Sequence, residues 1–425
     1  MLKRIAKLTK GSYPTMKKIV ALVLALVMLC SVAAIATAEE HEPVTIEFLC
    51  WGAAETTTAP AFTAMIEGFM AKYPWITVEV TESNYDGVNT SLLTRVASGD
   101  APDVAQVSNQ WVAAYVEMDG VIALEDLFDD ATIADFNAGS MEGTVIGGKH
   151  YSAAWIMQPF GLYCNMDLLA AAGYDHTPTT WAEYIQMARD VAKLGTNAEG
   201  NAVYGIALGT QVLANGGYGI LPYIWAHGAE FFGDDGSVTF NSEATVAAYT
   251  EIQDLVKEGV IATGLQIVDN RSLFGNGQVA FHIDAPSQVK NFANVNLEVC
   301  AIPETSTITS DHHICVFEGT EHPEECALLV DYLTGPEGMD LYTQNNSVIC
   351  ARYSVEELPY FQNLEGTTAV FFKLAGVAKS LPVQTSSFVA AMESIASGIQ
   401  SLTIGLEDPA TVVADTAAKL AEYYK

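Results

Sequence analysis

The residues best suited to chemistry lie in the stretch ASGDAPDVAQVSNQW, residues 97–111. A short β-prone run, 104–107, ends there in polar residues and a tryptophan rather than in a glycine or proline turn. The amides of Asn109 and Gln110 can each donate and accept hydrogen bonds, and Trp111 offers a flat apolar ring. These groups are suited to holding a polar ligand without covalent chemistry. The alternative for Trp111 is that it begins a helix and packs inward.

Motifs for catalysis or for metal binding do not accompany this stretch. The sequence contains no GxSxG, no HExxH and no glycine loop of the kind that cradles phosphates. His312 and His313 are adjacent, and neighbours along a strand point to opposite faces, which is poor metal geometry. The acidic stretch GDDGS lacks the alternating ligands of a calcium loop. We therefore expect a protein without a metal, without a cofactor and without enzymatic activity.

The N-terminus has the anatomy of a secretory signal peptide. The first 18 residues carry six Lys or Arg and no acid, residues 19–29 are apolar, and AIATAEE offers a cleavage site after Ala38. Residues 1–15 read as an upstream start-site artefact. We expect a signal peptide over residues 1–38 and a mature chain outside the cytoplasm. Two alternatives are a retained membrane anchor and lipidation at Cys30, which the preceding leucine disfavours.

Cleavage leaves a strongly acidic chain. The mature protein keeps 13 Lys and Arg against 51 Asp and Glu, a net charge of −38. Such a surface repels nucleic acid and anionic lipid, so we expect neither as a partner. The acids are scattered along the chain, which indicates a solvated exterior.

Six cysteines remain after cleavage. An even number in an exported protein is compatible with disulfides. However, Cys50, Cys300 and Cys315 lie inside apolar runs, where cysteine behaves as a small hydrophobic residue, and no CxxC spacing occurs. We expect buried free thiols rather than disulfides.

The mature chain alternates short apolar runs with amphipathic segments, which predicts an α/β architecture. At 425 residues it is long enough for two domains. The expected strands are 44–51, 76–80 and 103–107. The expected helices are 60–74, 88–99, 180–195, 241–259, one within 322–338 that ends at Gly335-Pro336, and 408–424. In parallel sheets ligands bind beyond the carboxyl ends of the strands. Trp51 and Asn109–Trp111 lie at such ends.

With these elements placed, the chain resembles the solute-binding proteins of ABC importers, in the sugar-binding family that includes maltose-binding protein. The resemblance rests on six pieces in order: TIEFLCWG, FMAKYPWITVEV, ASGDAPDV, GLYCNMDLLAAAGYDHTPTTWAEY, FGNGQVAFHIDAPSQV and CALLVDYLTGPEG. It implies a periplasmic-binding-protein-like α/β fold of two lobes, each a mostly parallel sheet flanked by helices, joined by hinge strands. The first lobe would hold residues 39–153 and 284–335, and the second 154–283 and 336–425.

The resemblance also implies which residues hold a ligand. A sugar offers hydroxyls and weakly polar C–H faces, so its site needs aromatic platforms, amides and carboxylates. Besides Asn109, Gln110 and Trp111, the positions that match are Trp51, Glu55, Trp155, Gln158, Tyr218, Trp225, Asp284 and Phe388. Core packing is the alternative for the tryptophans. One aromatic of the family pattern is replaced by Ser287, which shifts the expected ligand away from maltose-like chains.

The resemblance implies a monomeric binding protein that delivers a mono- or oligosaccharide to the transmembrane subunits of an ABC permease. A peptide or a polyamine is the alternative ligand, and a ligand sensor on the same fold is an alternative role. An exported carbohydrate-active enzyme stays open in principle, since 51 acids could supply two facing carboxylates.

Overall fold

The computed structural model describes residues 41–211, 219–231, 237–346, 348–379 and 385–424. Residues Thr45–Lys425 form one compact unit, which contains both sheets that matter for function. Among the described residues, no helix combines the length and the apolar character needed to cross a bilayer.

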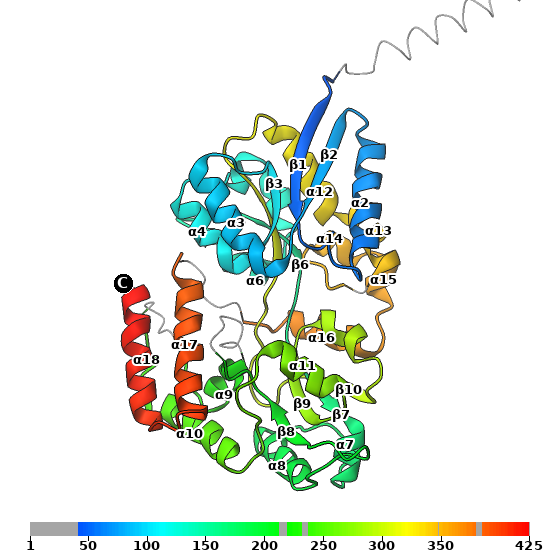
Figure 1. Ribbon diagram of the computed structural model, residues 1–425. Helices are drawn as coiled ribbons and strands as arrows, with labels where there is room; N and C mark the ends of the chain where they lie inside the picture. The colour runs from blue at the N-terminus through cyan, green and yellow to red at the C-terminus, as the bar shows by residue number, and fades with distance from the viewer. Residues whose placement is uncertain (1–40, 212–218, 232–236, 347, 380–384, 425) are drawn as a thin grey trace, which may run out of the picture. The chain divides into compact units, whose positions relative to one another are not determined.

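The first lobe is built on a five-stranded sheet of order β2-β1-β3-β11-β6. Its strands are β1 (Val44–Cys50), β2 (Ile76–Glu82), β3 (Val104–Ser108), β6 (Ala153–Ile156) and β11 (His312–Val316). Its main helices are α2 (Ala59–Lys72), α3 (Tyr85–Ser98), α4 (Val112–Glu117), α12 (Pro323–Thr334) and α13 (Pro336–Asn345). The first of these lies with α12 and α13 on one side of the sheet, and α3 and α4 lie on the other (Figure 1).

Local sequence signals explain where these helices begin and end. The Asn84 side chain accepts the Gly87 N–H at the start of α3, and Gly99, with φ of 71°, ends the helix. The helix expected to begin near Pro323 and to end at Gly335-Pro336 is α12, and Pro336, which lacks an amide hydrogen, starts the next helix, α13. The other expected elements are found within a few residues of their predicted bounds.

The second lobe is built on a four-stranded sheet of order β10-β7-β9-β8. Its strands are β7 (Gly161–Asn165), β8 (Tyr204–Ala207), β9 (Val279–Asp284) and β10 (Leu297–Cys300). One face packs against α8 (Trp181–Ala192), α9 (Leu221–Ala226), α10 (Glu243–Lys257) and α17 (Phe388–Thr403). The opposite face presents Tyr163 to rings from α11 (Ile267–Gly275), the 3-10 turn η4 (Pro286–Phe292) and α16 (Gly366–Ala375).

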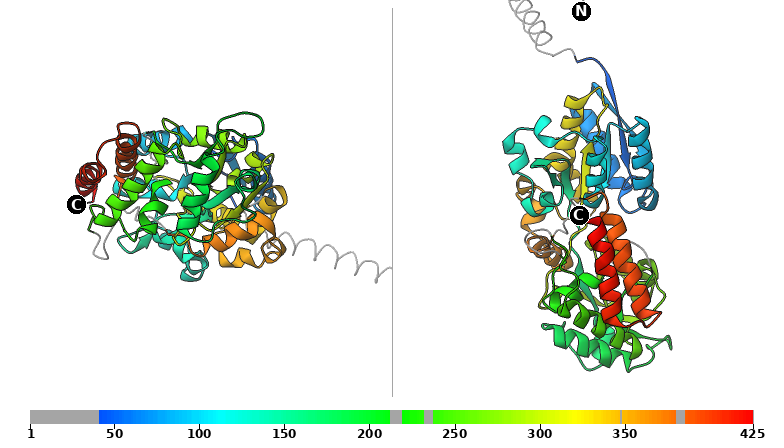
Figure 2. Two further views of the ribbon diagram at one scale, coloured as in Figure 1. Left: turned by 90° about the horizontal axis from the view of Figure 1, so that it is seen from below. Right: turned by 90° about the vertical axis from the view of Figure 1, so that its left-hand side faces the viewer.

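The last helix of the chain, α18 (Pro409–Tyr423), packs along α17, and the two lie side by side in both side views (Figures 1 and 2). The remaining elements are short: η1 (Asn109–Trp111), η2 (Leu124–Asp126), α5 (Asp130–Ala134), α6 (Ala138–Glu142), β4 (Val145–Ile146), β5 (Lys149–His150), α7 (Met166–Ala171), α14 (Tyr353–Glu356) and α15 (Pro359–Gln362).

The two-lobed α/β fold is confirmed, but the sheets are mixed rather than mostly parallel. Strands β1 and β3 pair in parallel, as do β8 and β9, whereas β11 pairs antiparallel with β3 and β6, and β7 with β9 and β10. The reason is topological. Strands β11 and β7 each enter their lobe from the hinge. They therefore run opposite to β3 and β9, which end at the hinge side of their sheets.

The lobe boundaries also differ from those expected at 153, 284 and 336. Strand β6 lies in the first sheet, β10 pairs with β7 in the second, and α13 packs against α2 of the first lobe. Residues 286–300 therefore go with the second lobe, and residues 336–345 with the first. The four residues of β10, LEVC, do not determine which strand β10 pairs with, because that choice depends on contacts distant in the sequence.

Hinge segments join the lobes where the chain passes between the two sheets. The Phe160 N–H donates to the Ile308 carbonyl at 2.9 Å, and the Ser310 N–H donates to the Gln158 carbonyl at 3.2 Å. The Lys379 N–H donates to the Thr307 carbonyl at 2.8 Å, so the segment around Lys379 lies along the segment 307–310. As expected from the absence of a linker, the chain crosses between the lobes more than once.

Candidate functional site

An aromatic cluster lies where β1 and β3 end. Trp51 follows β1, and its ring centroid is 5.7 Å from that of Trp111 in an edge-to-face arrangement. Tyr85, the first residue of α3, is 5.5 Å from Trp51 and 5.4 Å from Trp111. Both tryptophans are buried, with Trp51 only 2% exposed, whereas Tyr85 is 39% exposed. Tyr85 is therefore the ring that this cluster offers to solvent, and the tryptophans support it.

The predicted amides lie beside this cluster. Asn109 and Gln110 form η1 and are both buried. The Asn109 N–H donates to the Asp311 carbonyl at 3.1 Å, and the Gln110 amide donates to the Ser310 hydroxyl at 3.2 Å. Contacts with the hinge segment thus fix the position of both residues.

Gln158 approaches the same point from the first hinge segment. Its carbonyl accepts from Ser310, so Ser310 connects Gln158 to Gln110. The Gln158 side chain is buried, and its Oε1 atom has no hydrogen-bond partner among the described residues. A buried acceptor without a donor is costly, and a ligand hydroxyl would satisfy it. The structure thus brings together Asn109, Gln110 and Gln158 as predicted from the sequence.

A buried carboxylate, Asp311, holds these segments in place. It accepts the Gln158 N–H at 2.9 Å and the hydroxyls of Ser140 and Thr309. Burial raises the pKa of Asp311, and the three hydrogen bonds oppose that rise only in part. Folding therefore disfavours the ionised form of Asp311 relative to the unfolded chain.

We expect the substitution Asp311→Asn to change how stability depends on pH. A group whose pKa is raised by folding stabilises the folded state most below its unfolded pKa, about 3.9, and that contribution is lost as the pH rises. The variant should gain free energy of unfolding relative to wild type between pH 4 and pH 7, as measured by urea unfolding. If the free energy of unfolding of the variant falls relative to that of wild type between pH 4 and pH 7, the burial argument is contradicted.

Asp284 does not have the role predicted from the sequence. Its carboxylate is fully buried and accepts two hydrogen bonds from Arg271, at 2.7 and 2.9 Å, one from His282 and one from its neighbour's backbone N–H. A carboxylate has about four lone-pair sites, and all four are occupied. The prediction that Asp284 accepts from a ligand hydroxyl is therefore wrong. Arg271, which also acts electrostatically on Tyr85, is the partly exposed member of the pair.

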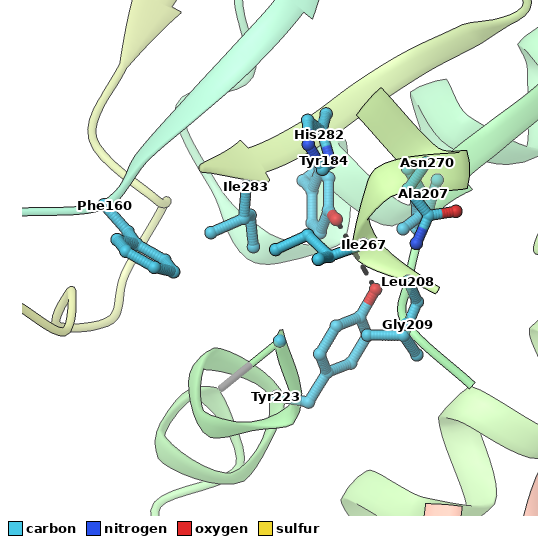
Figure 3. Close-up of a pocket in the computed structure, with 12 residues that line it drawn as sticks. Phe160, Tyr184, Ala207, Leu208, Gly209, Tyr223, Ile267, Asn270, His282 and Ile283 are labelled. Carbon is cyan, nitrogen blue, oxygen red and sulfur yellow. Dashed lines mark hydrogen bonds between the residues drawn. The ribbon is translucent and has the colours of Figure 1, made fainter. Parts of the chain in front are cut away.

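A small cavity of about 30 Å³ lies beyond the ends of β8 and β9 (Figure 3). Tyr184 and Tyr223 line it, with their hydroxyls 3.4 Å apart, together with Asn270 and His282. The Asn270 Oδ1 and His282 Nδ1 atoms are buried and have no partner among the described residues. The volume suits a single water molecule rather than a sugar ring.

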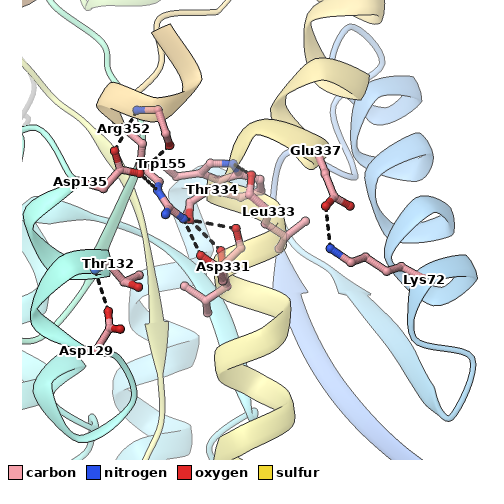
Figure 4. A network of polar contacts seen from close by, with 12 residues as sticks. Lys72, Asp129, Thr132, Asp135, Trp155, Asp331, Leu333, Thr334, Glu337 and Arg352 are labelled. Carbon is pink, nitrogen blue, oxygen red and sulfur yellow. Dashed lines mark hydrogen bonds and ion pairs between the residues drawn. The ribbon is translucent and has the colours of Figure 1, made fainter. Parts of the chain in front are cut away.

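Trp155 is a core residue, and the prediction that it faces a ligand is wrong. It is 1% exposed, its indole N–H donates to the Leu333 carbonyl at 2.8 Å, and its ring packs against Phe48 and Phe62. Strand β6 is the edge strand beside β11, and α12 packs against it, so all four of its residues are buried. Figure 4 shows Trp155 next to the polar network around Arg352.

Arg352 belongs to a structural ion-pair network. Its Nε atom is 2.7 Å from Asp135, and its Nη1 atom is 2.7 Å from Asp331 (Figure 4). The side chain is buried and also donates to the Thr334 hydroxyl. The arginine is thus engaged within the first lobe.

The other predicted residues do not join the strand-end cluster. Glu55 is exposed in the loop after β1, and Phe388 is buried in the core of the second lobe. Trp225 lies in α9 under the Lys379 ammonium, 5.1 Å from the ring centroid, beside a separate groove. Tyr218 lies outside the described residues.

Three residues of the site were missed in the sequence. Tyr85 follows a helix cap, Arg271 is one of 13 cations in the mature chain, and Ser310 precedes the conspicuous DHH triplet. The rarity of cations was a usable signal for Arg271. Nothing local marked Tyr85 or Ser310, because their partners come from other segments. In the described part of the chain no cluster of metal-ligating side chains is found.

Comparison with known proteins relates the chain to one family. The model of the bacterial extracellular solute-binding protein family matches residues 53–340. A binding protein of Brucella abortus is 25% identical over 378 residues, covering 85% of this chain and 89% of the relative. The periplasmic-binding protein YcjN of an Escherichia coli ABC transporter is 24% identical over 250 residues, covering 56% of this chain and 55% of the relative.

Solved structures share the fold. The GacH receptor of Streptomyces glaucescens, known unliganded and with acarbose, has a TM-score of 0.79 at 21% identity, covering 90% of this chain and 99% of the receptor. Maltose-bound MalE3 of T. maritima has a TM-score of 0.75 at 21% identity, covering 89% and 99% of the two chains. Because the family model spans more than half of its length, the chain belongs to the bacterial extracellular solute-binding protein family.

Proposed function

We propose that the protein is the substrate-binding component of an ABC importer and captures a mono- or oligosaccharide between its lobes without transforming it. The observation that carries the proposal is the gathering of an exposed aromatic ring and three amide side chains at one edge of the first sheet: Tyr85, Asn109, Gln110 and Gln158. Several structural neighbours are sugar-binding proteins by their published descriptions, which supports the same ligand class here.

The chemistry of the cluster suits a neutral polyol. Amides donate and accept at once, as a sugar hydroxyl does, and an aromatic ring covers a face of C–H groups. The unpartnered Gln158 Oε1 supplies a ready acceptor. Arg271 of the second lobe is the partly exposed member of its pair with Asp284, so a ligand that contacts both Tyr85 and Arg271 would touch both lobes. Contact with both lobes is what lets a ligand shift the population toward a closed state.

The proposed role in an ABC importer also implies a location and partners. We propose that the signal peptide is removed after Ala38 and that the mature monomer works outside the cytoplasm. Its partners would be the transmembrane subunits of an ABC permease, which is supported by the Escherichia coli relative, the periplasmic-binding protein of an ABC transporter.

Thermal unfolding of residues 39–425 in the presence of candidate ligands tests the ligand class. The panel contains mono- and oligosaccharides, peptides, polyamines and glycerol phosphate. A ligand that binds only the folded state stabilises it by about 2.7 kcal/mol at a hundred times its Kd. We expect one class of sugar to raise the Tm. A rise with peptides or polyamines alone would replace the sugar with that class.

Substitution of Tyr85 tests the site itself. We expect Tyr85→Ala to weaken sugar binding about tenfold, equivalent to about 1.4 kcal/mol, because the exposed ring face is lost. Tyr85→Phe keeps the ring and should bind within about twofold of wild type. Isothermal titration at a temperature where both variants are folded measures the difference. Equal affinity for the alanine variant and wild type would exclude Tyr85 as a contact.

A further inference from the structure

Two thiols face each other across neighbouring strands of the second sheet. Cys164 on β7 and Cys300 on β10 have sulfur atoms 3.9 Å apart, and both are free. The strands are antiparallel, with Cys164 opposite Glu298 and Cys300 opposite Leu162. The two cysteines are therefore diagonal neighbours on the same face of the sheet, a relation in which side chains reach each other.

The two thiols differ in access to solvent. Cys164 is fully buried in the core of the second lobe, whereas Cys300 is partly exposed. Cys300 lines an open groove of about 790 Å³ together with Thr177, Trp225, Glu304 and Lys379. A small oxidant can therefore reach Cys300 and not Cys164. Three other buried cysteines have polar partners that are not sulfur: Gln106 for Cys50, the Tyr151 carbonyl for Cys315 and Thr320 for Cys326.

From this geometry we propose that Cys164 and Cys300 are a reversible oxidation site, which a small-molecule disulfide converts into a β7–β10 disulfide. The two thiols share an S–H···S hydrogen bond, and this contact, together with a hydrogen bond from Thr177, lowers the pKa of Cys300 despite its partial burial. Cys300 therefore supplies the attacking thiolate, because the thiolate is the nucleophile.

The reaction proceeds by two exchanges. The Cys300 thiolate attacks one sulfur of the disulfide reagent, the S–S bond of the reagent breaks, and one thiol leaves with a proton from solvent. Cys164 then loses its proton to solvent and attacks the Cys300 sulfur, which expels the second thiol. The protein loses two hydrogens and the reagent is reduced to two thiols. The sulfurs need to approach from 3.9 Å to about 2.05 Å, which side-chain rotation and a small strand shift can provide.

The bond would connect residues 136 positions apart in the sequence. Closing so long a loop restricts the unfolded chain, so oxidation should raise the Tm, and dithiothreitol should reverse the rise. Strand β10 is an edge strand of its sheet, so the bond would tie that edge to β7. The proposal concerns exposure to oxidants outside the cytoplasm and does not depend on the identity of the ligand.

The test uses reduced residues 39–425 incubated with oxidised glutathione. One portion is taken for intact mass, and a second is alkylated and then analysed by peptide mapping. We expect the wild-type protein to lose about 2 Da and to yield a linked peptide pair containing residues 164 and 300. The variant Cys164→Ser should retain one glutathione on Cys300, and Cys300→Ser should leave residue 164 unmodified. Persistent glutathione on Cys300 of the wild type, another linked pair, or no loss of thiols would overturn the proposal. The wild-type map decides the question even if a variant fails to fold.

Discussion

Replacement of Arg271 with alanine is expected to lower the free energy of unfolding at pH 7 by about 3–5 kcal/mol, because it leaves the buried Asp284 carboxylate without its cationic partner. Burial alone would raise the pKa of Asp284, but the hydrogen bonds from Arg271 and His282 outweigh it and hold the pKa well below its usual range. A lowered pKa stabilises the folded state above the unfolded pKa, about 3.9, and the contribution is lost as the pH falls. The deficit of the variant should therefore be largest at neutral pH and shrink toward pH 3.

Arg95→Ala is the matched control. Arg95 forms the same two-pronged pair with Glu47, at 2.8 and 2.7 Å, but both side chains are partly exposed. Solvent-exposed pairs contribute about 0–1 kcal/mol, so this variant should lose little stability. Urea unfolding at several pH values measures both. Similar losses for the two variants would show that burial of Asp284 is not the deciding factor.

The substitution Trp155→Ala is expected to cost about 3–5 kcal/mol of unfolding free energy. The ring fills the space between Phe48 and Phe62, and its N–H satisfies the Leu333 carbonyl. Removal leaves a cavity and an unpaired buried acceptor. Trp155→Phe should keep part of the packing and cost less.

Trp75 provides the comparison for Trp155. It follows α2, is partly exposed and contacts Tyr73 edge to face. Trp75→Ala should lower the free energy of unfolding by about 1 kcal/mol, as a typical substitution does. Unfolding of the three variants in urea measures the order. A Trp155→Ala variant as stable as wild type but unable to bind sugar would restore Trp155 to the ligand site.

Much of the fold was visible in the sequence because its signals are local. Polar caps at Thr180 and Ser242 accept the amides of residues 183 and 245, where the expected helices begin. Alternation in ITVEV fixed β2, and the breaker Gly99 ended α3. The run DVAQV ends one residue before β3 does, and the amides that follow β3 lie at the sheet edge.

The rest depends on partners distant in the sequence. The sequence shows that residue 284 is an aspartate but not whether it contacts a ligand or Arg271. The fold decides this, because it packs α11 against β9. The burial of Trp155 likewise depends on a distant element, because α12 packs against strand β6 and excludes solvent. Tyr85 became a candidate only when α3 placed it against Trp51 and Trp111. Residue types thus indicated a ligand site, whereas long-range contacts decided which residues can form it.

Isothermal titration of the mature chain with the sugar that raises its Tm, with recovery of the sugar by chromatography, tests the central claim most directly. The account predicts one binding site per chain, a sugar recovered intact, and binding about tenfold weaker in Gln158→Ala, which removes the free amide acceptor. Glu55→Ala, in the exposed loop after β1, should bind like wild type. Cleavage of the sugar, or undiminished affinity in Gln158→Ala, would contradict a binding protein that uses this cluster.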